Sequence, residues 1–185
     1  VTLSAIAGTG TLRGDERTAS QLGNNVLIGN ASANTLYGLS GDDTLNGGGG
    51  ADTLHGGLGN DVYYSDNSTA QIIEVSNGGI DTIRSARTSM DLTSFGLLEN
   101  LSLLEDTGAT SATGNGLGNK LIGNALANSL SGAGGNDTIE GGAGNDTVDG
   151  GAGNDVLWGG LGNDTLRDTV SYGNDTYRWG RNEGS

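Results

Sequence analysis

The sequence contains no cysteine and no proline, has a single histidine, and is poor in aromatic residues, which make up 4% of its 185 positions. The lack of cysteine excludes disulfides and thiolate metal ligands. Leu, Ile, Val and Phe together account for about a fifth of the chain, close to the roughly 20% below which chains tend to be disordered. No apolar run approaches the ~20 residues of a transmembrane helix, so we expect no membrane insertion. Something besides apolar burial must therefore help to hold the fold.

Basic residues are also few, because 8 Lys and Arg stand against 22 Asp and Glu, and the formal net charge is −14. A chain of this sign repels the phosphates of nucleic acids and of anionic lipids. The same charge attracts cations. We therefore expect no nucleic acid partner, and the composition favours metal ions.

Glycine is abundant, with 37 residues, and it recurs in phase. From Gly132 the chain reads GAGGNDTIE, GGAGNDTVD, GGAGNDVLW and GGLGNDTLR, and from Gly38 it reads GLSGDDTLN, GGGGADTLH and GGLGNDVYY, both with a period of nine. The sixth position is always aspartate, at Asp43, Asp52, Asp61, Asp137, Asp146, Asp155 and Asp164. The eighth is apolar or aromatic, at Leu45, Leu54, Tyr63, Ile139, Val148, Leu157 and Leu166. A flexible linker needs no such phase, which argues against that interpretation.

The repeats fall into two similar units. Each block follows a variant with asparagine at position six, GNASANTLY from Gly29 and GNALANSLS from Gly123. We predict a first unit over 1–97, with nonapeptides in 22–64 and spacer coils in 65–97. A second unit over 98–185 has nonapeptides in 114–167 and a truncated spacer, so we expect the chain to be a fragment of a longer protein.

One repeat predicts a turn followed by a three-residue strand. Glycines at positions one, two and four permit positive φ, and only position eight of the strand points inward, because side chains alternate along a strand. A strand that buries one side chain must stack on copies of itself. Two nonapeptides then form one coil of 18 residues, and turns two repeats apart lie about 4.8 Å apart on the same edge. This arrangement places Asp43 beside Asp61, Asp137 beside Asp155, and Asp146 beside Asp164.

Carboxylates at that spacing repel one another unless a cation lies between them. A hard cation with 6–8 oxygen ligands suits two carboxylates and several turn carbonyls, which is calcium chemistry. Magnesium demands stricter octahedral geometry, and zinc prefers His and Cys ligands. The repeat therefore predicts several calcium ions.

The pattern GGxGxDxUx resembles the repeat of the RTX (repeats-in-toxin, or haemolysin-type calcium-binding) family. The resemblance implies an all-β fold, a right-handed parallel β-roll with calcium bound in the turns between its rungs. It also implies a secreted, extracellular or cell-surface protein, exported by a type I secretion machinery and folded on external calcium.

The resemblance further implies the ligands. One loop would donate the carbonyls of positions two and four with its position-six side chain, and the loop 18 residues on would donate the carbonyls of positions one and three with its own. The implied sets are Leu39, Gly41 and Asp43 with Gly56, Leu58 and Asp61; Ala133, Gly135 and Asp137 with Gly150, Ala152 and Asp155; and Gly142, Gly144 and Asp146 with Gly159, Leu161 and Asp164.

Two further sets involve asparagine loops: Asn30, Ser32 and Asn34 with Gly47, Gly49 and Asp52; and Asn124, Leu126 and Asn128 with Gly141, Ala143 and Asp146. An amide oxygen carries less charge, so we expect these sites to bind calcium less tightly, and the pairs of Asn25 with Asp43 and Asn119 with Asp137 less tightly still. Asp175 follows Asp164 by 11 residues instead of nine. We therefore expect its loop to be out of register with Asp155.

The segment from Ser65 to Ser111 lacks the motif. Its strand-like runs, 71–75 and 81–85, predict longer coils of the same solenoid, and a short helix near 97–101 is the alternative. His55 falls at an outward position and predicts a surface side chain rather than a catalytic base. With one histidine and no cysteine, we expect no enzyme activity.

Three functions are compatible with this pattern. The first is a calcium-dependent folding and secretion module. The second is a calcium-dependent adhesin or carbohydrate-binding domain, in which Trp158 and Trp179 could contact a surface polysaccharide. The third is an accessory module of a secreted hydrolase or epimerase. An ice-binding face is disfavoured, because position three shows no threonine row.

Overall fold

The computed structural model describes residues 2–4, 10–13, 23–66, 69–170 and 173–178. The described residues form 19 β-strands and no helix. The chain divides into two compact units, Val1–Arg84 and Ser85–Ser185, each of which is a parallel β-solenoid. Trp179 lies outside the described residues.

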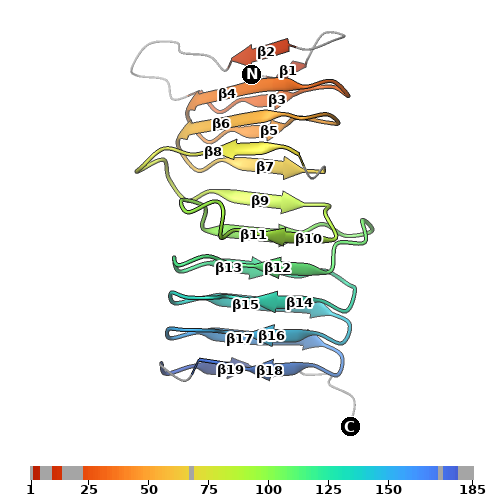
Figure 1. The fold of residues 1–185 in the computed structure, drawn as a ribbon, viewed down its shortest axis with the longest axis vertical. Helices are drawn as coiled ribbons and strands as arrows, with labels where there is room; N and C mark the ends of the chain where they lie inside the picture. The colour runs from red at the N-terminus through yellow and green to blue at the C-terminus, as the bar shows by residue number, and fades with distance from the viewer. Residues whose placement is uncertain (1, 5–9, 14–22, 67–68, 171–172, 179–185) are drawn as a thin grey trace. The chain divides into compact units, whose positions relative to one another are not determined.

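The first unit consists of two parallel sheets whose strands alternate along the chain (Figure 1). One sheet contains β1 (Thr2–Ser4), β3 (Val26–Ile28), β5 (Thr44–Asn46), β7 (Val62–Ser65) and β9 (Thr82–Ser85). The other contains β2 (Gly10–Arg13), β4 (Asn34–Ser40), β6 (Thr53–Leu58) and β8 (Gln71–Ile73). The register advances by one coil per pair, as in Leu27 beside Leu45 and Leu45 beside Tyr63.

The second unit has the same construction. One sheet contains β11 (Asn100–Leu103), β13 (Lys120–Ile122), β15 (Thr138–Ala143), β17 (Val156–Leu161) and β19 (Thr176–Arg178). The other contains β10 (Ser89–Asp91), β12 (Ser111–Thr113), β14 (Ser129–Ser131), β16 (Thr147–Asp149) and β18 (Thr165–Arg167). The predicted 18-residue coil is confirmed, for example by Ile139 beside Leu157.

The core of each unit is a pair of ladders built from the eighth repeat position. Leu36, Leu45, Leu54 and Tyr63 are 0% exposed in the first unit, and Ile139, Val148 and Leu157 are at most 1% exposed in the second. The flanking residues face outward, because side chains alternate across a three-residue strand. Each rung therefore buries few side chains, as the composition predicted.

The spacer contributes longer coils to both units. β8 and β9 confirm the two strand-like runs, and Leu101 lies in β11, so the helical alternative is wrong. In the described part of the chain, no helix has the length and apolarity that crossing a membrane requires. His55 lies on β6, where its ring stacks on that of Tyr37 with centroids 4.4 Å apart, and is half-buried.

Candidate metal centres

The position-six aspartates lie in the turns, with side chains that are buried except in Asp164, which is half-buried. Each uses one carboxylate oxygen, Oδ1, to accept a backbone N–H from the residue one coil earlier. The N–H of Asp43 donates to Asp61 at 2.7 Å, that of Asp137 to Asp155 at 2.8 Å, and that of Asp146 to Asp164 at 2.9 Å. These bonds confirm the stacking that the period of nine predicted.

The second oxygen of these carboxylates is left open. Oδ2 is buried and has no hydrogen-bond partner among the described residues in Asp43, Asp61, Asp137, Asp146, Asp155 and Asp164. A buried acceptor without a partner costs about 1–3 kcal/mol, and more when it is charged. A row of such oxygens on successive coils therefore calls for a cation or for protons.

The electrostatics of the turns lead to the same conclusion. Burial raises the pKa of Asp61 and of Asp137 to about 7, and that of Asp146 to about 6, against an ordinary value of 3.8. The backbone N–H bonds lower each pKa in part, whereas the carboxylates of neighbouring coils raise it further. The ionised form is therefore disfavoured until a positive charge enters the turn.

Glycine at position one makes room for the carboxylate. A Cβ added to Gly132 would overlap Oδ2 of Asp137, and it would also overlap the carbonyl oxygen of Gly150 from the next coil. The open carboxylate oxygen and a turn carbonyl of the next coil therefore approach the same Cα atom. Gly135, at position four, has φ of 105°, which glycine adopts without strain.

The three aspartate-based sets that we predicted are each brought together between stacked turns. In the first set, the carbonyl of Leu39 lies against Gly57, and that of Gly41 lies against Gly59. The position-three carbonyl of Leu58 already accepts the N–H of Gly41 at 2.7 Å. The other two sets repeat this geometry, with the carbonyls of Ala152 and Leu161 accepting from Gly135 and Gly144 at 2.8 Å. The loops thus converge on one another as the predicted ligand scheme requires, and the assignment of individual ligands stays a prediction.

The asparagine loops differ from the aspartate loops in a way that the sequence did not reveal. Oδ1 of Asn128 accepts the N–H of Asn124 at 2.8 Å, and its amide NH₂ donates to Oδ1 of Asn124 at 3.0 Å. In the first unit, Oδ1 of Asn34 accepts the N–H of Asn30 at 2.7 Å. The amide oxygens that we expected to bind calcium are therefore engaged within their own turns. Calcium binding at the two asparagine-based sets stays a prediction.

The loop that contains Asn115 and Asn119 also carries asparagine side chains, and their amide groups bond to backbone carbonyls. The NH₂ of Asn119 donates to the carbonyl of Glu99 at 3.0 Å and to that of Leu98 at 3.3 Å. The NH₂ of Asn115 donates to the same Leu98 carbonyl at 2.8 Å. In this loop the side chains direct N–H donors at the turn carbonyls, whereas the aspartate side chains of the other loops offer only acceptors.

The expectation that Asp175 lies out of register is wrong. Oδ1 of Asp175 accepts the N–H of Asp155 at 2.9 Å, as a position-six aspartate does. Asp81 makes the equivalent bond to the N–H of Asp61 at 2.8 Å. The two extra residues are accommodated before the aspartate, because the strand that follows it pairs in register, with Thr176 beside Val156.

The donor set fits calcium. All the groups that converge in the aspartate turns are carboxylate or carbonyl oxygens, which are the ligands of a hard cation that accepts irregular geometry. The chain has no cysteine, and its one histidine lies on a strand, stacked on Tyr37. The aspartate turns therefore have the wrong chemistry for zinc.

Comparison with known families agrees with this geometry. A family model described as the RTX calcium-binding nonapeptide repeat matches the chain in four copies, over residues 21–54, 28–63, 113–148 and 131–166. These matches together span just over half of the chain. The chain belongs to this RTX family. No curated protein sequence gives a significant match.

Membership of the RTX family accounts for the open oxygens. RTX repeats bind calcium, and they are typical of secreted proteins. The matched ranges contain the aspartate pairs in the turns, whereas the spacer between them is unmatched. The chain is thus a calcium-binding RTX module built on a β-solenoid.

Proposed function

We propose that this RTX module is a folding element of a secreted protein, in which calcium is structural and which folds outside the cell after type I secretion. In this proposal the module itself carries no catalytic activity. The observation that carries it is the row of buried, open Oδ2 atoms in the aspartate turns. These atoms lie between stacked coils of the matched repeats, so a cation bound to them would stabilise the coils on both sides.

The energetics favour a chain that depends on calcium. Each open carboxylate oxygen costs about 1–3 kcal/mol when it is buried, and several of them together match the 5–15 kcal/mol that usually separates folded from unfolded domains. The thin core offers little compensation, because each strand buries few side chains. A site that exists only in the folded chain contributes its binding free energy directly to folding.

This dependence suits a protein that crosses the cell envelope unfolded. Calcium modules outside cells typically bind in the range of about 10⁻⁴–10⁻³ M. Inside the cell such sites would stay empty, so the chain would remain extended and competent for export. Contact with external calcium would then start folding.

The decisive experiment compares circular dichroism of the full chain in excess chelator, in magnesium and in calcium. We expect a coil-like spectrum in chelator and in magnesium, and a β spectrum in calcium. A β spectrum that persists in excess chelator would refute calcium-dependent folding. Folding by equal magnesium would refute the assignment of the sites to calcium.

A second function is favoured by one exposed aromatic side chain. Trp158 on β17 is 39% exposed, and its register neighbours on the outer face are Glu140 and Arg178. Exposed tryptophan is enriched at binding interfaces, because it combines a large apolar ring with a polar N–H group. Calcium-dependent binding to a glycan array that is lost in Trp158→Ala would support a carbohydrate-binding role, and equal binding by both proteins would exclude this face.

A further inference from the structure

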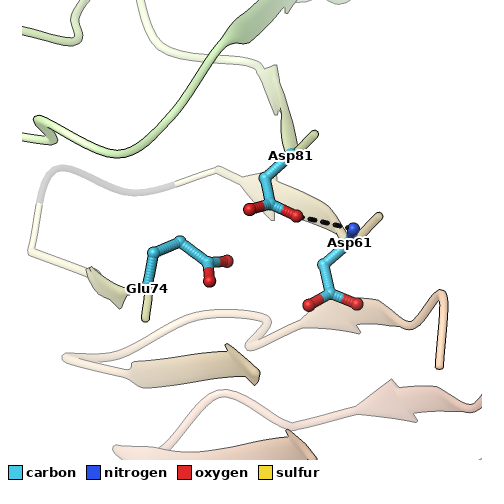
Figure 2. A group of neighbouring side chains, drawn as sticks. All are labelled: Asp61, Glu74 and Asp81. Atoms are coloured by element: carbon cyan, nitrogen blue, oxygen red, sulfur yellow. Dashed lines mark hydrogen bonds between the residues drawn. The ribbon is translucent and has the colours of Figure 1, made fainter. Parts of the chain in front are cut away.

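Three carboxylates lie close together in the first unit, one from a nonapeptide and two from the spacer that follows it. Asp61 precedes β7, Glu74 follows β8, and Asp81 precedes β9. One carboxylate oxygen of each residue lies within 4.8 Å of those of the other two. Figure 2 shows the Glu74 carboxylate pointing toward those of Asp61 and Asp81.

The local fold explains why these residues meet. Asp81 takes the place of a position-six aspartate one coil beyond Asp61, because its Oδ1 accepts the Asp61 N–H at 2.8 Å. Glu74 follows β8, which belongs to the sheet that does not contain β7 and β9. β8 pairs with β6 so that Ile73 lies beside His55, which places Glu74 next to Gly56, the first residue of the Asp61 turn. The longer spacer coil therefore brings a third acid to a turn that otherwise has two.

The Asp61 side chain directs an open oxygen into this group. Asp61 is 0% exposed, and its Oδ2 has no hydrogen-bond partner among the described residues. A Cβ added to Gly56 would overlap both this Oδ2 and the hydroxyl oxygen of Tyr63, so the two oxygens approach the same point. The Tyr63 hydroxyl in turn donates to Oε1 of Glu74. Oδ2 of Asp61 thus faces the side on which Glu74 lies.

We propose that Asp61, Glu74 and Asp81 form a calcium site that is distinct from the nonapeptide pairs, and that Tyr63 positions Glu74 for it. Three carboxylates in a buried turn repel one another strongly without a cation. An all-oxygen set with three negative charges suits a hard ion such as calcium, or a lanthanide of similar chemistry. Glu74 distinguishes this site, because it lies in the spacer, outside the matched repeats.

The second unit provides an internal comparison. An offset of 94 residues aligns Asp61, Glu74 and Asp81 with Asp155, Asp168 and Asp175. Asp175 bonds to Asp155 as Asp81 does to Asp61, but Oδ1 of Asp168 accepts the N–H of Val170 in its own turn, at 3.0 Å. The counterpart of Tyr63 is Leu157, which has no hydroxyl to hold the acid. The same sequence positions therefore carry acids in the second unit, but the third acid bonds within its own turn there.

The test is to measure the number and affinity of the calcium ions bound by the full chain in Glu74→Gln, by equilibrium dialysis over a range of calcium concentrations. Glu140→Gln is the matched control, because Glu140 lies at an outward strand position of a repeat. We expect Glu74→Gln to bind one ion fewer than the parent, or to bind one ion about 10–100-fold less tightly, and the control to match the parent. Unchanged binding by Glu74→Gln, or an equal loss in Glu140→Gln, would overturn the proposal.

A second readout reports whether an ion binds beside Tyr63. Terbium bound beside Tyr63 should emit when the tyrosine is excited, because the hydroxyl oxygen of Tyr63 adjoins Oδ2 of Asp61. We expect this emission to fall at least several-fold in Tyr63→Phe and in Glu74→Gln, while the β spectrum in calcium is retained. Emission that survives in Glu74→Gln would overturn the proposal, whatever happens in Tyr63→Phe. A parent chain that binds no calcium at all would instead refute the proposed function.

Discussion

Replacing Asp146 with asparagine is expected to stabilise the ion-free turn that Asp146 occupies and to reduce its stabilisation by calcium. Asp146 is 1% exposed, its Oδ1 accepts the N–H of Asn128 at 2.8 Å, and its Oδ2 is open. Asparagine keeps the shape and the Oδ1 acceptor, and it replaces the open oxygen with an NH₂ group near the carbonyl of Gly159. Without calcium, the variant should therefore be more stable than the parent, by about 1–3 kcal/mol.

In calcium the same substitution removes a site. A site that binds only the folded chain contributes about 2.7 kcal/mol when the free ligand is at 100 times its dissociation constant, and about 4.1 kcal/mol at 1,000 times. The gain in the free energy of unfolding between chelator and calcium should therefore be smaller in Asp146→Asn by about these amounts. This difference between two conditions cancels any effect of the substitution on the ion-free fold.

The assay is urea unfolding followed by circular dichroism, in chelator and in calcium, with sucrose added equally to bring the chelated chain into a measurable range. Asp42→Asn is the matched control. Asp42 is exposed at position five, where its Oδ1 accepts the N–H of Asn60, and Asn136 makes the same bond to Asn154 in the second unit. If Asp146→Asn gains as much from calcium as the parent does, Asp146 is not a calcium ligand and the reasoning is refuted.

Three further outcomes are expected. Burial raises the pKa of Asp137 to about 7 from an ordinary 3.8, so the ion-free fold holds a proton that the unfolded chain has lost. The free energy of unfolding of the ion-free fold should therefore fall as pH rises from about 4 to about 7, whereas its calcium affinity should rise. Urea and calcium titrations at pH 5 and pH 8 would show or contradict both trends. Gly150→Ala should lower the free energy of unfolding in calcium by about 1–3 kcal/mol, because its Cβ would overlap the neighbouring carboxylate, and Gly134→Ala, which has room, should not. Hydrogen exchange during a calcium titration should protect amides of 137–164 before those of 43–61, because the second block has more all-acid pairs, and the opposite order would disprove this ranking.

The sequence alone determined most of the fold. A period of nine with one apolar residue per strand allows only a stack of coils, so the strands, the 18-residue register and the buried ladder through Leu45 and Ile139 could all be predicted. The aspartate pairs followed from the same register, because turns two repeats apart must lie on one edge. The choice of calcium followed from the chemistry of those acids and from the absence of cysteine.

The tertiary structure decided what lies off the repeat. Counting residues placed Asp175 out of register, but a turn can absorb two extra residues while its aspartate keeps the bond to the coil before. Glu74 showed no motif, and only the pairing of β8 with β6 brings it to Asp61. Likewise, an asparagine at position six has the same spacing as an aspartate, and the sequence does not show which atoms its amide contacts. In the structure, Asn128 bonds within its own turn, because an amide carries both a donor and an acceptor, whereas a carboxylate carries only acceptors and leaves one open.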